Sequence, residues 1–257
     1  MKKVRPVCIL CAILMVWGVS CSSNLQVKKE QEESLRDLGE AYMGQGNYTA
    51  ALRELFKAER LYSKDPYLQN DLGITYMAKK KFDQAIKHFQ KALELKPDYA
   101  PAKNSLGIAY FKKGDLDTAI SIFKELSQDI LYGTPQYPLT NLGSVYFNKK
   151  DYFLAEKYYQ EALDIRPNFI NALIGIGKTH IKMGKISEAI KELEKASEIS
   201  PAIPDVHYYL ANAYSISGDY KKALNAYSKV IALAPDSLLA EKAKQDADKI
   251  KNFDMGL

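Results

Sequence analysis

The sequence predicts an all-α fold: a solenoid of six helix-turn-helix repeats, closed at its C-terminal end by a capping helix. Three features of the sequence predict it. A Leu-Gly-x-x-Tyr pattern and its relaxed copies recur at steps of 34, 34, 36, 34 and 34 residues, an alanine follows each copy twelve residues later, and prolines close most of the repeats. A fixed period of this length is typical of helical repeats, because a single helix pair cannot bury its own apolar face.

The first helix of each repeat is predicted around a small residue. Glycine in the middle of a helix costs about 1 kcal/mol relative to alanine, so glycine repeated at one period indicates that two helices approach closely there. The alanine of the second helix removes bulk at the same crossing, and a large residue four positions later, from Leu55 to Tyr227, fills the space beside it. The packing positions are Gly39, Gly73, Gly107, Gly143, Gly177 and Ala211 in the first helices, and Ala51, Ala85, Ala119, Ala155, Ala189 and Ala223 in the second helices.

Turn and stop residues separate the predicted helices. Between the two helices of a repeat stand Gly46-Asn47, Gly114-Asp115, Gly184 and Gly218-Asp219. Prolines follow the second helix of four repeats, at Pro97, Pro167, Pro201 and Pro235. Glycine favours the left-handed conformation that ends a helix, and proline cannot continue one, so these residues mark the helix boundaries.

The repeats occupy residues 32–236, divided as 32–65, 66–99, 100–135, 136–169, 170–203 and 204–236. Residues 237–257 are predicted to form the capping helix and a tail. Leu239, Ala243, Ala247 and Ile250 fall on one face of that helix, and charged residues fall on the other. A helix of this kind shields the apolar side of the last repeat from water.

Residues 1–20 are predicted to be a signal peptide. The basic start MKKVR is followed by an apolar run from Val7 to Val19 and then by Ser20-Cys21, which is the order of a secretory signal. The run is shorter than the roughly 20 apolar residues that span a bilayer. We therefore expect export, with residues 21–31 as a polar tether between the leader and the repeats.

Composition argues against nucleic-acid binding. The formal net charge is +5 for 257 residues, and it falls to +2 once Lys2, Lys3 and Arg5 leave with the signal peptide. A chain so nearly balanced has no electrostatic basis for binding a polyanion.

The sequence also lacks the elements of an enzyme. His88, His180 and His207 occupy repeat positions without a cysteine, histidine or carboxylate at metal-ligand spacing, and no glycine-rich phosphate loop is present. We therefore predict a non-enzymatic protein with no cofactor, no metal and no small-molecule substrate.

The repeats resemble the tetratricopeptide repeat (TPR) family over residues 32–237, although the family tryptophan is missing from all six copies. The resemblance implies a right-handed TPR superhelix whose first helices line a concave groove that binds a peptide. The inward positions of the family are the second, fifth, ninth and twelfth of each repeat. From the second to the sixth repeat, the groove residues predicted among those positions are Tyr67, Asn70, Ile74, Met77, Asn104, Ile108, Phe111, Tyr137, Thr140, Ser144, Phe147, Asn171, Ile174, Lys178, Tyr208 and Asn212.

This mixture of side chains suits a protein partner. Aromatic and aliphatic groups supply apolar burial, and asparagine amides can hydrogen-bond an extended backbone whatever its sequence. The alternative is that some of these residues pack only against neighbouring helices.

Cys21 is the predicted lipidation site. Its setting, Gly18-Val19-Ser20-Cys21, resembles the lipobox of bacterial lipoproteins, although Gly18 stands where a large aliphatic residue is usual. The resemblance implies an acylated Cys21 as the first mature residue and, with Ser22 next, an outer-membrane anchor facing the periplasm. The alternative is ordinary cleavage nearby, which leaves a soluble periplasmic protein.

The irregular step of 36 falls in residues 127–143, where Pro135 and Pro138 are expected to disrupt the helix and Tyr132 and Tyr137 to offer apolar contacts. The segment Asp-x-x-Tyr-x-Thr-Pro that begins at Asp129 resembles the PilF/PilW family of type IV pilus biogenesis lipoproteins, or pilotins. That resemblance implies outer-membrane secretin subunits as the partner and an adaptor that aids their targeting or assembly. The alternative is a TPR lipoprotein that organises peptidoglycan hydrolases or another envelope complex.

Overall fold

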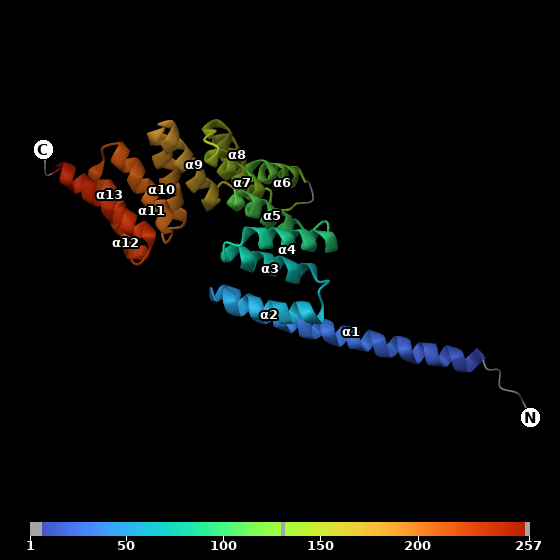
Figure 1. Ribbon diagram of the computed structural model, residues 1–257. Helices are drawn as coiled ribbons and strands as arrows, with labels where there is room; N and C mark the ends of the chain where they lie inside the picture. Colours follow the sequence, from blue (N-terminus) through green and yellow to red (C-terminus); the bar gives the residue numbers. More distant parts are fainter. Residues whose placement is uncertain (1–6, 130–131, 255–257) are drawn as a thin grey trace, which may run out of the picture. The chain divides into compact units, whose positions relative to one another are not determined.

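The computed structural model describes residues 7–129 and 132–254, and the side chains of residues 24–129 and 132–252. Those parts of the chain hold thirteen helices and no strand, which confirms the all-α prediction (Figure 1). The helices are α1 (Val7–Gly44), α2 (Tyr48–Leu61), α3 (Pro66–Ala78), α4 (Phe82–Leu95), α5 (Ala100–Lys113), α6 (Leu116–Gln128), α7 (Gln136–Asn148), α8 (Tyr152–Ile165), α9 (Ile170–Met183), α10 (Ile186–Ile199), α11 (Pro204–Ile216), α12 (Tyr220–Leu233) and α13 (Leu238–Asp254).

The chain divides into two compact units, Met1–Asp115 and Leu116–Leu257, called here the N-terminal and the C-terminal unit. In the N-terminal unit α1 packs on α2 and α3 on α4, while α3 also contacts α1 and α5. In the C-terminal unit α7, α9 and α11 pack on α8, α10 and α12, and each of α7, α9 and α11 contacts the next odd-numbered helix. The odd-numbered helices α1 to α11 are the first helices of the repeats, and they lie side by side within each unit.

Glycines on the first helices meet the large residues of the second helices. A Cβ atom on Gly73 would lie 2.5 Å from Cε1 of Phe89, and one on Gly143 would lie 2.7 Å from Cδ1 of Tyr159. Phe89 is fully buried, and the alanine of every second helix is fully buried as well. The glycine column therefore makes room for a large side chain of the same repeat, and the helices of a pair pack closely over it.

One residue in each of six equivalent turns has a positive φ angle. Four of them are Gly46, Gly114, Gly184 and Gly218, as the turn signals predict. In the second and fourth repeats the same position is occupied by Lys80, with φ of 57°, and Lys150, with φ of 63°. The turn geometry is thus kept where glycine is missing, and the lysines adopt a conformation that costs an L-residue about 1–2 kcal/mol.

Prolines end the second helices as predicted. Helices α4, α8, α10 and α12 end two residues before Pro97, Pro167, Pro201 and Pro235. The expectation for Pro138 was wrong, because it lies inside α7, which continues to Asn148. Pro138 stands in the first turn, where a backbone N–H has no partner within the helix, so the ring disrupts nothing. Pro135 is the residue before α7.

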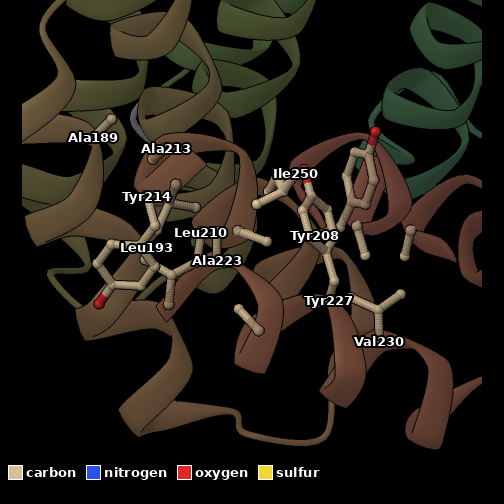
Figure 2. Close-up of a cluster of buried hydrophobic side chains, with 14 residues drawn as sticks. Ala189, Leu193, Tyr208, Leu210, Ala213, Tyr214, Ala223, Tyr227, Val230 and Ile250 are labelled. Carbon is tan, nitrogen blue, oxygen red and sulfur yellow. The ribbon is translucent and has the colours of Figure 1, made fainter. Parts of the chain in front are cut away.

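The predicted capping helix is α13. It packs on α12 and α11, and Ala243, Ala247 and Ile250 are buried in one cluster with Tyr208 and Tyr227. Figure 2 shows the side chains of this cluster gathered between the helices. The cap therefore completes the core of the last repeat.

The N-terminal segment is part of the 38-residue helix α1. Residues 24–31, in the stretch expected to act as a tether, are all exposed. The structure does not describe the side chains of the predicted signal peptide, residues 1–20, or of Cys21. Among the residues that the structure describes, no helix combines the length and the apolar character needed to cross a bilayer.

Candidate functional site

The predicted groove residues lie on the first helices of both units. Tyr67, Asn70, Ile74 and Met77 belong to α3, and Asn104, Ile108 and Phe111 belong to α5. In the C-terminal unit, Tyr137, Thr140, Ser144 and Phe147 belong to α7, Asn171, Ile174 and Lys178 to α9, and Tyr208 and Asn212 to α11. Each unit thus presents its own face of first helices.

Most of these residues reach the surface. Tyr67, Tyr137 and Asn171 are exposed, and ten others are half-buried. Asn70, Thr140 and Tyr208 are buried, so the prediction that they line an open groove is wrong.

Neighbouring groups explain the burial of these three. Thr140 donates its hydroxyl to the carbonyl oxygen of Gln136 in its own helix, at 2.8 Å. Tyr208 is covered by α13, where its hydroxyl donates to Asp246 at 2.8 Å. The amide nitrogen of Asn70 lies 3.5 Å from a carboxylate oxygen of the next residue, Asp71.

On the face of the C-terminal unit, a lysine side chain lies between two aromatic rings. The Nζ atom of Lys178 on α9 lies 5.3 Å from the ring centre of Phe147 on α7 and 4.8 Å from that of Tyr209 on α11. Cations are attracted to the negative faces of such rings, so this contact joins three consecutive first helices. Tyr209 was missed from the sequence because the family rule selects its neighbour Tyr208, and no signal in the sequence distinguishes the two.

A hollow of about 490 Å³ lies on the same unit, lined by residues of α9, α11, α12 and α13. Asn212 and Ser215 supply polar groups to it, and Ile181 and Ile216 supply apolar surface. Ile216 is 58% exposed. Apolar surface beside a few polar groups is what a bound polypeptide segment requires.

Tyr137, from the irregular junction, contacts the next repeat. Its ring meets the buried ring of Phe169 edge-on, with centres 5.0 Å apart. Tyr137 therefore makes the predicted apolar contact, which packs α7 against the start of α9.

The face of the N-terminal unit is strongly charged. Arg36 on α1 contacts Asp65 at 2.5 Å, Glu40 at 3.5 Å and Asp71 at 4.0 Å. Beside it, Lys96 stands 5.0 Å from the ring centre of Tyr67. Arg36 and Glu40 were not among the groove residues predicted from the sequence, which start at the second repeat. They stand at the fifth and ninth positions of the first repeat, residues 32–65, so the family rule selects both.

The three histidines make structural contacts. Nδ1 of His88 lies 2.8 Å from Oε1 of Gln69, Nε2 of His180 lies 2.9 Å from Glu156, and Nε2 of His207 lies 2.7 Å from the carbonyl oxygen of Pro201. Across the described part of the chain, no three His, Cys, Asp or Glu residues are grouped so that they could hold a metal ion.

Models of the tetratricopeptide repeat match most of the repeat region. One described as TPR repeat matches residues 73–114, and three described as tetratricopeptide repeat match residues 105–129, 137–202 and 204–237. Together these matches span more than half of the chain.

Among solved structures, this chain is similar to PilW, described as a widely conserved type IV pilus biogenesis factor, with a TM-score of 0.71 and 21% identity over 82% of this chain and 97% of PilW. It is also similar to PilF of Pseudomonas aeruginosa, with a TM-score of 0.67 and 19% identity over 85% of this chain and 99% of PilF. At these identities the likeness establishes the fold alone.

Among curated proteins, the chain is 29% identical to Superkiller protein 3 of Schizosaccharomyces pombe over 102 residues, which are 40% of this chain and 7% of that protein. The chain spans less than a quarter of the length of the curated relatives that it matches.

Proposed function

Because this chain belongs to the tetratricopeptide repeat family, we propose that it is a non-enzymatic adaptor of the bacterial envelope that binds a protein partner on the faces of its first helices. The exposed Tyr67, Tyr137 and Asn171, with the hollow beside Asn212, support this proposal. Apolar rings and amides placed together bind an extended segment through burial and backbone hydrogen bonds.

The adaptor acts in type IV pilus assembly, and its partner is the outer-membrane secretin. The observation that carries this proposal is the extent of the likeness to PilW and PilF, which covers 97% and 99% of those solved chains. The segment that begins at Asp129 and the setting of Cys21 agree with it. In this mechanism the first helices hold a segment of the secretin while an acylated Cys21 keeps the complex at the outer membrane.

Deleting the gene tests the proposal, with secretin multimers followed by non-denaturing electrophoresis. We expect the multimers to be lost or mislocated and to return with the wild-type chain. Lys178→Glu places a negative charge between two aromatic rings, so we expect it to restore multimers poorly. The matched control is Lys191→Glu, on an exposed position of α10, which should complement fully. Normal multimers and pili in the deletion strain would refute the pilus assignment.

The runner-up function is a scaffold for peptidoglycan hydrolases or another envelope complex, since helical repeats of this family serve many partners. A pull-down from detergent-solubilised envelopes separates the two. Recovery of hydrolases without the secretin would favour the scaffold.

A further inference from the structure

One side of α1 is bare, although the same side of every later first helix is covered. In each repeat the third, seventh and tenth residues lie on one side of the first helix, because their spacing follows the helical turn. From the second to the sixth repeat all of these residues are buried, and the seventh is at most 8% exposed. In the first repeat they are Ser34, Leu38 and Ala41, and all three are exposed, with Leu38 at 43%.

The cover on the later first helices is a second helix. Helix α2 packs on α3, α4 on α5, α6 on α7, α8 on α9, and α10 on α11, so each of these first helices contacts the second helix of the preceding repeat. Helix α1 has no preceding repeat, and within the described parts of the chain it contacts α2 and α3 alone. The bare side of α1 therefore corresponds to a surface that packs against a helix five times in the same chain.

The bare side continues beyond the first repeat toward the N-terminus. Val27 and Gln31 are exposed as well, and they precede Ser34, Leu38 and Ala41 at alternating steps of four and three residues. We call these five residues the open face of α1. None of them carries a charge, and the face runs for roughly 20 Å along the helix. Alternating steps of this kind are typical of a seam between two helices.

The two borders of the open face differ in charge. Glu30, Glu33 and Asp37 follow one border, at steps of three and four residues, and all are exposed. Lys28 stands on the other border. We call the row of three carboxylates the acidic border.

The other two cations in the described side chains of α1 are directed toward the α2–α3 connection. Lys29 lies over the ring of Tyr62, with Nζ 5.0 Å from the ring centre. Arg36 lies 3.9 Å from Asp37 but makes its shorter contact, of 2.5 Å, with Asp65. The acidic border is thus free to face positive charge on a docked helix, and such charge pairs select the partner of a helix seam.

These borders disfavour a second copy of α1 as the occupant. If two copies packed antiparallel through their open faces, like borders would meet, and the acidic borders would repel each other. If they packed parallel, Glu30 and Asp37 would face Leu35 and Tyr42 of the other copy, which supply no positive charge. A different helix with basic residues beside its apolar stripe avoids both problems.

We propose that the open face of α1 binds an amphipathic helix of a protein partner, with lysine or arginine side chains of that helix along the acidic border. The bound helix packs on α1 as the preceding second helices pack on α3 to α11, and its apolar stripe covers Leu38. The open face lies outside the groove positions, so this inference goes beyond the proposed function.

The test uses two lactam-stabilised helical peptides as probes. Both carry the same stripe of alanine and leucine, and beside the stripe one carries lysines and the other glutamates. Each is added to the full ¹⁵N-labelled mature chain in detergent micelles. We expect the lysine peptide to shift amide signals of α1 and to bind at least about tenfold more tightly than the glutamate peptide.

Two variants locate the binding on α1. Leu38→Lys places a charge in the middle of the open face and should lower the affinity for the lysine peptide at least about tenfold. Leu238→Lys is the matched control, because it changes a leucine that is 85% exposed on α13, and it should bind as the wild type does. Glu30→Gln combined with Asp37→Asn should remove most of the preference for the lysine peptide. All of these positions are exposed, so the variants are expected to fold, and circular dichroism checks this.

Equal binding of the two peptides to the wild type, no binding of either peptide, or full affinity of Leu38→Lys would each overturn the proposal. A wild-type dimer that Leu38→Lys dissociates, measured by light scattering, would overturn it too, because a second copy would then occupy the face. The peptide assay does not involve the secretin. A strain that needs the chain for secretin multimers while the peptides do not bind would refute the helix site and leave the proposed function standing.

Discussion

At the residue scale, glycines of the first helices pack closely against large side chains of their partner helices. In the second repeat this pair is Gly73 and Phe89. The Phe89 ring is fully buried and cannot swing into solvent. An added methyl group must therefore displace the ring or separate the two helices.

We expect Gly73→Ala to destabilise the chain by about 1–3 kcal/mol, because overpacking a filled core forces side chains and backbone to shift. Urea unfolding followed by circular dichroism measures the change. Gly44→Ala is the matched control, since a Cβ there meets no atom within 4 Å and alanine favours a helix. If both variants had the same stability, the close contact would have no energetic importance.

For the two lysines at positive φ, Lys80 and Lys150, we expect a substitution to raise stability and not to lower it. Lys80→Gly should stabilise the chain by roughly 0.5–1 kcal/mol, because glycine removes the strain of the left-handed conformation while losing some entropy on folding. Lys150→Gly should behave alike. Thermal melting compares each variant with the wild type. Gly114→Lys, which creates the strained turn in the third repeat, should lower stability, and a gain there would contradict the argument.

The buried acid Glu32 predicts a pH dependence. It faces Asp65 and Arg36, with Glu33 beside it, and its pKa of about 7 lies above the ordinary 4.5. Between these values the unfolded chain has lost a proton that the folded chain keeps, so stability falls as the pH rises from 4.5 to about 7. Urea unfolding across this range should show a flatter dependence for Glu32→Gln and the wild-type slope for Glu188→Gln.

At the element scale, α13 replaces the repeat that would otherwise cover the end of the stack. Tyr208, Tyr227 and Val230 are 3%, 2% and 0% exposed, and the cluster that holds them includes three residues of α13. The last helix pair therefore depends on α13 for its core.

Removing residues 238–257 should uncover this cluster at a cost of about 1.5–3 kcal/mol for each large apolar side chain that becomes exposed. Hydrogen exchange should then show loss of protection in α11 and α12, while α3 and α4 in the other unit keep theirs. Truncation after Asp254 is the control, because it leaves α13 intact. Unchanged protection in α11 and α12 would mean that the cap is dispensable.

At the scale of the whole molecule, the proposed function needs the repeats at a membrane surface. Several acyl chains at Cys21 would hold them there stably, whereas one chain binds reversibly. We expect the intact mass of the mature protein to show diacyl or triacyl addition, and Cys21→Ser to move the chain to the soluble periplasmic fraction. A variant that stayed membrane-bound would contradict lipid anchoring at Cys21.

Local chemistry explains which features could be predicted from the sequence. A proline lacks the N–H that continues a helix, and a glycine tolerates positive φ, so the ends of α4, α8, α10 and α12 and four of the turns follow from residue types alone. The positive φ angles of Lys80 and Lys150 could not be predicted in this way, because they come from the packing of the helices that these residues join.

The sequence by itself determined the all-α repeat, its period and its cap, because these depend on patterns that recur within about 34 residues. Only the tertiary structure decided which groove positions stay open. Asn70, Thr140 and Tyr208 occupy the fifth position of their repeats, as the half-buried Asn104 and Ile174 do, yet their neighbours bury them. The contacts of Arg36 with Asp65 and Asp71 also required the structure, since charges far apart in the sequence act together only when packing brings their helices into contact.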